Sequence, residues 1–183
     1  MKIEITPKYV IIKQQEYCCV PTCIQMIFSR RNIPLIYQED IGWELGLIVP
    51  EKDKHLFNRI RTRSNGSPDK NYLPGFFTNV NKFFQKYDLQ LHMDAYSIEK
   101  VKDVKEFICK QISEGNDTIA CFNSKKLNGK NDGEHVALIS AIDEDKVELA
   151  DPAGWFRTVQ LTNLINSMEY SGKEKGGGFW VVK

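Results

Sequence analysis

The sequence lacks the features that would place it in a specialised class of protein. No apolar run approaches the length that crosses a bilayer, and the formal net charge is only +1. Neither a membrane span nor a nucleic-acid partner is therefore expected. The 183 residues are 42% hydrophobic and 27% charged, which is typical of globular proteins. We expect one domain, residues 1–183, that is long enough to bury a core of its own.

Signals for disulfides, secretion and metal binding are also missing. Five cysteines is an odd number, and their spacings do not suggest a disulfide framework. The start of the chain has no apolar run before a cleavage site, so a reducing cytoplasm is the expected location. Structural zinc needs four well-spaced ligands. Beyond Cys18, Cys19 and Cys23 no second pair of Cys or His stands close together, so no metal or other cofactor is expected.

The sequence does contain a helix signal that begins at a cysteine. Around Pro21 the apolar residues recur at helical intervals of three and four, at Val20, Cys23, Ile24, Ile27 and Phe28. Proline suits the first turn, because the N–H that it lacks would have no intrahelical partner there. Cys19, or alternatively Cys18, then lies at the positive end of the helix dipole, which favours the nucleophilic thiolate. An upstream glutamine and the N–H at the helix start are candidate donors to an oxyanion.

A second segment, more than a hundred residues downstream, supplies a base for this thiol. A polar loop leads to His135 at the start of the expected strand 136–142, and the strand 147–150 ends at Asp151. If a tight turn at 143–145 joins these strands into an antiparallel hairpin, His135 and Asp151 lie side by side at one end. A carboxylate that orients an imidazole beside a thiol is the arrangement of an activated cysteine.

The rest of the chain predicts an α+β fold with a mostly helical first half and mostly antiparallel strands in the second. An extended segment at 3–13 precedes the expected helices, which are 20–31, 38–47, 76–87, 102–113 and 162–168; the expected strands are 89–96, 118–122, 136–142, 147–150, 156–161 and 179–182. Residues 49–75 are basic and rich in helix breakers. They are interpreted as a solvated loop with one helical turn at 56–60, and the alternative is a loop over the substrate cleft.

These motifs carry a resemblance to a known family. Cys19–Met26, which reads Cys-Val-Pro-Thr-Cys-Ile-Gln-Met, looks like the nucleophile helix of the C39-like branch of papain-fold cysteine peptidases, where Cys-Gly-Pro-Ala/Thr precedes an apolar helix. Glu134–Leu138 and Asp151–Ala153 resemble the histidine and Asp-Pro segments of the same family. The resemblance extends from about residue 10 to the end of the chain, and 49–75 has no match. It implies a papain-like cysteine peptidase fold, with a helical lobe and a sheet lobe.

The resemblance also implies a function for particular residues. Cys19 would be the nucleophile, His135 the base, Asp151 the residue that orients it, and Gln14 the lining of the oxyanion hole. The glutamine precedes the nucleophile by five residues instead of the usual six, so Gln15 is a second candidate. Cys19 is preferred to its neighbour Cys18 because it aligns with the family's Pro-Thr pair and with the helix face.

Three functions follow as hypotheses. The first is a cysteine peptidase that hydrolyses a peptide or protein substrate through a thioester intermediate, without a cofactor. The second keeps the same site and passes the acyl group to an amine or a thiol, as the papain-fold phytochelatin synthases do. The third is a peptide-binding module without catalysis, suggested by Val20, which stands where the family usually has glycine. The intact set of Cys, His and Asp argues against this third hypothesis.

Overall fold

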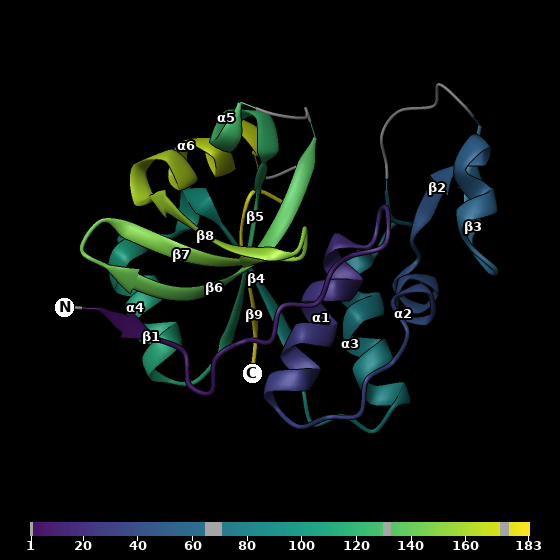
Figure 1. The fold of residues 1–183 in the computed structure, drawn as a ribbon, viewed down its shortest axis with the longest axis horizontal. Helices are drawn as coiled ribbons and strands as arrows, with labels where there is room; N and C mark the ends of the chain where they lie inside the picture. The colour runs from purple at the N-terminus through teal and green to yellow at the C-terminus, as the bar shows by residue number, and fades with distance from the viewer. Residues whose placement is uncertain (1, 65–70, 130–132, 173–175) are drawn as a thin grey trace.

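The computed structural model of the chain describes residues 2–64, 71–129, 133–172 and 176–183. Its main element is a seven-stranded antiparallel sheet in the order β4-β9-β5-β6-β7-β8, with β1 paired to β6 (Figure 1). The strands of this sheet are β1 (Ile3–Glu4), β4 (Met93–Ser97), β5 (Asp117–Asn123), β6 (Glu134–Asp143), β7 (Lys146–Asp151), β8 (Trp155–Gln160) and β9 (Gly178–Val182).

Helices pack on both sides of this sheet. One group forms a separate helical lobe on the right of Figure 1 and consists of α1 (Cys19–Arg30), α2 (Gln38–Leu45) and α3 (Phe76–Lys86). The other group lies with the sheet on the left and consists of α4 (Val104–Ser113), α5 (Ser124–Asn128) and α6 (Leu161–Ser171). Within the described part of the chain, no helix combines the length and the apolar character that crossing a bilayer requires. The expected α+β fold, with a helical lobe and an antiparallel sheet, is confirmed.

Two hydrophobic cores, one on each face of the sheet, explain this arrangement. Side chains alternate between the faces of a strand, and in β5 Ile119 and Cys121 join the core under α1 and α3. The intervening Ala120 and Phe122 join the core under α4 and α6. Every residue of β5 is buried, as expected for a strand that is covered on both faces.

The C-terminal end of α1 is fixed to the sheet by a buried cluster of charges. The Asp117 carboxylate at the start of β5 accepts hydrogen bonds from Arg30 Nε at 2.6 Å, Arg31 Nε at 2.6 Å and Tyr9 Oη at 2.8 Å. The Asp117 side chain is fully buried and that of Arg30 is only 6% exposed. This cluster therefore joins the helix that begins at Cys19 to the sheet that carries His135.

The region 49–75 corrects one prediction. Instead of a helical turn at 56–60, the structure has a 3₁₀ helix at Glu51–Leu56 and a two-stranded parallel sheet of β2 (Ile48–Pro50) and β3 (Arg61–Arg63). Phe57 is buried in a third small core with Cys18, Leu47 and Val49, so this part of the segment is packed and is not a solvated loop. Residues 65–70 of the predicted loop lie outside the described residues.

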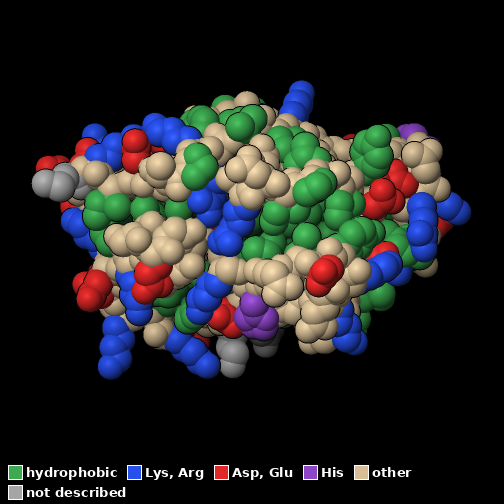
Figure 2. Space-filling view, turned by 90° about the horizontal axis from the view of Figure 1, so that it is seen from below, with side chains coloured by type: hydrophobic (Ala, Val, Ile, Leu, Met, Phe, Trp, Pro, Cys, Tyr) green, Lys and Arg blue, Asp and Glu red, His purple; other side chains and the backbone are tan. Residues whose placement is uncertain are grey.

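Hydrophobic side chains are also present on the surface of the helical lobe. Figure 2 shows the molecule from below, and on its right they gather between acidic and basic side chains. Exposed hydrophobic residues of this lobe are Leu35, Tyr37 and Tyr87. Exposed apolar side chains are normal on a folded protein.

Candidate active site

Three cysteines lie at the start of α1, and the structure separates them by exposure. Cys19 is the first residue of α1 and is partly exposed. Cys18 immediately precedes the helix and is buried, and burial raises the pKa of its thiol to about 12. Cys23, one turn later, is also buried, and burial raises its pKa well above the ordinary value. Because a thiolate rather than a thiol is nucleophilic, only Cys19 of these three combines access with the helix N-terminus.

His135 and Asp151 are in direct contact, as the predicted hairpin requires. His135 Nε2 and Asp151 Oδ1 are 2.8 Å apart. The same carboxylate oxygen accepts a hydrogen bond of 2.9 Å from the backbone N–H of Ala153, two residues further on. The Asp151 side chain is fully buried and that of His135 is 15% exposed. Since Nε2 faces the carboxylate, Nδ1 is the ring nitrogen that remains for a second partner.

A β-bulge at Ser140 gives the two residues a common face. Near the turn Ala141 pairs with Glu148, but beyond the bulge Leu138 pairs with Ala150, so one extra residue lies in β6. Continued to the end of β7, this register places Asp151 opposite Ala137, on the same face as His135. Without the extra residue Asp151 would share a face with Leu138, and His135 would point the other way. The Ser140 carbonyl, which lies in the bulge, accepts a 2.9 Å hydrogen bond from the N–H of Ile5.

The charges around His135 favour its imidazolium form. Burial lowers the pKa of His135, but the hydrogen bonds to Asp151 and to Cys19, together with the negative charges of both partners, outweigh burial and raise the pKa to about 9. Burial opposes ionisation of Asp151 too, yet the hydrogen bond and charge of His135, the Ala153 N–H and the Arg157 charge hold its carboxyl pKa below the usual range. His135 therefore stands between an ionised carboxylate and the Cys19 sulfur.

The two candidate glutamines have different surroundings. The Gln14 N–H donates a 2.7 Å hydrogen bond to the carbonyl of Pro152, which ties it to the turn after Asp151. Gln14 Oε1 is buried and has no hydrogen-bond partner among the described residues. The side chain of Gln15 instead donates from Nε2 to the carbonyl of Leu56 at 2.7 Å. The side-chain amide of Gln15 is therefore committed to another contact, and Gln14 is the glutamine beside the Asp-Pro turn.

The segment 49–75 contacts the approach to the nucleophile. Tyr17, two residues before Cys19, has a positive φ of 65°, a conformation that is uncommon for a residue other than glycine. Its hydroxyl donates a 2.6 Å hydrogen bond to Asp53 Oδ2 in the 3₁₀ helix Glu51–Leu56. Together with the bond from Gln15 to Leu56, this contact holds the backbone that precedes α1.

The other two histidines lie outside this site. His55 Nδ1 is 2.9 Å from the carbonyl of Lys52 in the exposed 3₁₀ helix, and His92 Nε2 is 3.2 Å from Asp94 Oδ1 on the surface. Across the described residues, no group of three or more His, Cys, Asp or Glu side chains is placed to hold a metal ion. The sequence analysis missed Arg157, which forms an ion pair with Asp151 from the neighbouring strand β8; its only sequence signal is its position six residues after that aspartate.

A solved structure shares this architecture. A crystal structure of a chain from Bacillus anthracis, described as a C39-like peptidase, superposes with a TM-score of 0.64 at 12% identity and covers 100% of this chain and 98% of that one. A double glycine motif protease from an AMS/PCAT transporter, solved with its leader peptide, gives a TM-score of 0.47 at 15% identity, with coverage of 100% and 96%. No curated protein sequence matches this chain significantly.

The helical lobe and antiparallel sheet thus form the papain-like fold that the sequence predicted. The sequence model described as the Peptidase_C39 like family matches residues 7–175. This chain belongs to that family.

Proposed function

We propose that the protein is a cysteine peptidase that hydrolyses peptide bonds, with Cys19 as nucleophile, His135 as base, Asp151 as the residue that orients the base and Gln14 as an oxyanion donor. The observation that carries this proposal is the position of the His135 imidazole. It is held by the buried Asp151 carboxylate on one side and interacts with the thiol at the start of α1 on the other. Membership of the Peptidase_C39 like family supports the same reaction class.

The first half of the reaction forms a thioester. Asp151 bonds Nε2 of His135 and so favours the tautomer in which Nδ1 is free to take the proton from the Cys19 thiol. The thiolate attacks the carbonyl carbon of the substrate, and the negative charge moves to the carbonyl oxygen. The Cys19 N–H lies in the first turn of the helix, where it has no intrahelical acceptor. With the Gln14 side-chain amide it donates to the oxyanion. His135 then protonates the departing amine, and the C–N bond breaks.

The second half returns the free thiol. A water molecule gives a proton to His135 and attacks the thioester carbon, so that the carboxylic acid leaves and Cys19 regains its proton. An amine or thiol in place of water would make the protein an acyltransferase with the same residues. No step in either reaction requires a cofactor. Peptides or proteins are the proposed substrates, and the five free thiols fit the proposed reducing, cytoplasmic location.

A trapping experiment on a mixed pool of peptides tests the proposal. The protein is incubated with the pool and quenched in acid, and mass spectrometry then searches for an acyl adduct on Cys19 and for new peptide termini. We expect both products in the wild type and neither in Cys19→Ser, while Cys18→Ser retains both. Cleavage products that carry an added amine would assign acyl transfer. Intact peptides and an unmodified Cys19 would leave the peptide-binding hypothesis in place and refute catalysis.

A further inference from the structure

Four neighbouring strands each place one side chain in a row that crosses the candidate site. Phe122 in β5 pairs with His135 in β6. Asp151 at the end of β7 pairs with Trp155 in β8, and Arg157 lies two residues further along β8, on the same face. The row therefore reads Phe122, His135, Asp151 and Arg157. Only the two central residues belong to the site that the sequence predicted.

Arg157 reaches back along this row to the carboxylate of Asp151. Its Nη2 forms an ion pair with Asp151 Oδ2, the oxygen that neither His135 nor Ala153 contacts. The guanidinium carbon also lies 5.6 Å from the centre of the Phe122 ring, within the range of a cation–π contact. The Arg157 side chain is only 18% exposed. Each oxygen of the buried carboxylate thus has a charged or polar partner.

This arrangement solves a physical problem of the site. A fully buried carboxylate that loses a partner for one oxygen either takes up a proton or turns toward another donor. Either change would weaken the bond between Oδ1 and His135 Nε2, which fixes the tautomer of the base. The Arg157 guanidinium beside the second oxygen opposes both changes, since its positive charge favours the ionised carboxylate and attracts that oxygen.

We propose that Arg157 is a positioning residue of the catalytic centre, which acts by holding Asp151 ionised and oriented toward His135. The inference rests on the proposed function, because it concerns how the base is prepared for Cys19. Arg157 does not touch the substrate or the reacting atoms in this scheme. Its effect passes through Asp151 alone.

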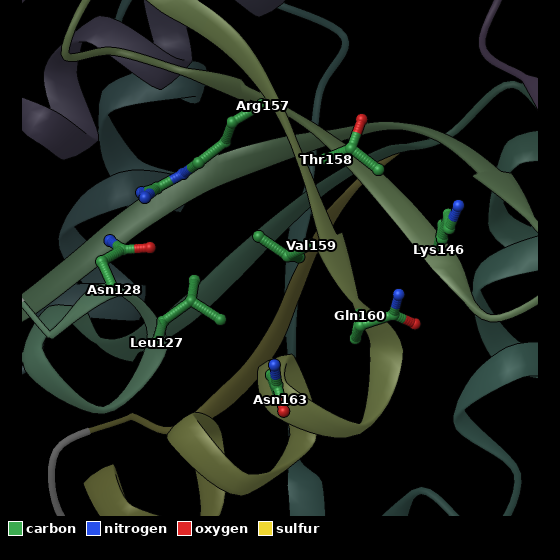
Figure 3. A pocket seen from close by; sticks show the side chains of 8 residues that line it. All are labelled: Leu127, Asn128, Lys146, Arg157, Thr158, Val159, Gln160 and Asn163. Carbon is green, nitrogen blue, oxygen red and sulfur yellow. The ribbon is translucent and has the colours of Figure 1, made fainter.

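The surroundings of Arg157 supply a matched control. Arg157 lines a pocket of about 530 Å³ between β8, α5 and α6, and it extends toward Asn128 (Figure 3). Lys146 lines the same pocket, on the opposite side from Arg157 in that view. It is the first residue of β7, whereas Asp151 is the last. A change at Lys146 removes a positive charge from the same pocket and leaves the partners of Asp151 in place.

The pH dependence of Cys19 alkylation by iodoacetamide reads out this role. The ionisable groups around Asp151 are His135 from β6, Arg157 from β8 and the Cys23 thiol from α1. Loss of the Arg157 charge makes the Asp151 carboxylate easier to protonate. The acid limb of the alkylation profile, which is the range where the rate of Cys19 labelling falls as the pH falls, then moves to higher pH. We expect Arg157→Gln and Arg157→Met to shift it upward by roughly one pH unit and to lower the plateau rate.

Charge-conserving and control variants complete the experiment. Arg157→Lys should restore the acid limb to its wild-type position but not the full plateau rate, because an ammonium does not reproduce the planar guanidinium that also contacts the Phe122 ring. Lys146→Gln should leave both quantities unchanged. Folded Arg157→Gln and Arg157→Met proteins with wild-type profiles would overturn the inference, as would an Arg157→Lys profile that coincides with that of Arg157→Gln.

Two remaining outcomes are also decisive. If circular dichroism shows that Arg157→Gln and Arg157→Met do not fold, Arg157→Lys decides alone: a lowered plateau on a wild-type limb supports the inference, and an unchanged plateau overturns it. Failure of the proposed function looks different. In that case the wild-type protein itself shows no preferential alkylation of Cys19, whatever stands at position 157.

Discussion

Asp117→Ala is expected to destabilise the protein far more than an ordinary loss of an ion pair. The Asp117 carboxylate is fully buried and binds Arg30, Arg31 and Tyr9 at 2.6–2.8 Å. The Arg30 side chain is only 6% exposed. Without the carboxylate, the remaining hydrogen-bond acceptors of its guanidinium are backbone carbonyls, and that of Gly115, at 2.9 Å, is the closer. The positive charge then remains buried without a counter-ion.

The magnitude follows from that burial. Breaking a buried ion pair by removing one partner costs about 3–5 kcal/mol, against a total free energy of unfolding of about 5–15 kcal/mol for a typical domain. The Asp94 carboxylate provides the control. It binds Lys183 Nζ at 2.9 Å, but the two side chains are 38% and 47% exposed. Asp94→Ala should cost no more than about 1 kcal/mol.

Urea unfolding followed by circular dichroism measures both values. The urea concentration at the midpoint of unfolding should be much lower for Asp117→Ala than for the wild type. The slope of unfolding free energy against urea, which reports the surface exposed on unfolding, should not change. High salt should remove the effect of Asp94→Ala and leave most of that of Asp117→Ala, since buried charges are screened much less. Equal costs for the two variants would refute the reasoning and would mean that α1 does not depend on Asp117 for its attachment to the sheet.

Two further predictions concern the site itself. Gln14→Ala should lower the rate of peptide cleavage by roughly a hundredfold or more, the usual effect of removing one oxyanion donor. Gln15→Ala should lower this rate clearly less, because the Gln15 amide bonds Leu56. Equal losses of rate in the two variants on the same peptide would contradict the assignment of Gln14 as the oxyanion donor. The pKa of His135 is raised to about 9 in the folded protein, whereas its value in the unfolded chain is about 6.5. The stability that protonated His135 contributes is therefore fully present below the unfolded-state pKa and is lost as the pH rises through the folded-state pKa. The difference in unfolding free energy between wild type and His135→Ala should thus shrink between pH 6 and about pH 9.5, and a constant or growing difference in urea titrations would rule out the ion pair.

Most of the arrangement of the candidate site could be anticipated from the sequence because its parts are local. Pro21 and the apolar spacing after it mark the start of α1, and His135 and Asp151 are sixteen positions apart with one tight turn between them. The number of residues between His135 and Asp151 does not reveal the bulge at Ser140. The extra residue decides which face His135 occupies, but it leaves no mark in the pattern of apolar residues, because β6 is buried on both faces over most of its length.

The parts that were missed depend on contacts between distant segments. Arg157 comes near Asp151 only because β8 pairs with β7 in one register, and an arginine in an edge strand is not distinctive in the sequence. The parallel pairing of β2 with β3 has no local signal either, and Phe57 is buried only because Cys18 and Leu47 lie against it. The bond from Gln15 to Leu56, which distinguishes the surroundings of the two glutamines, likewise has no local signal.

The most direct test of the central claim is the pH dependence of iodoacetamide labelling of wild type and His135→Ala, with each modified cysteine located by mass spectrometry. Cys109, which is also partly exposed, is the internal reference. We expect fast labelling of Cys19 at about pH 6, well below the ordinary thiol pKa of about 8.5, and loss of this labelling in the variant. Slow labelling of Cys19 that follows the profile of Cys109 in both proteins would contradict the account.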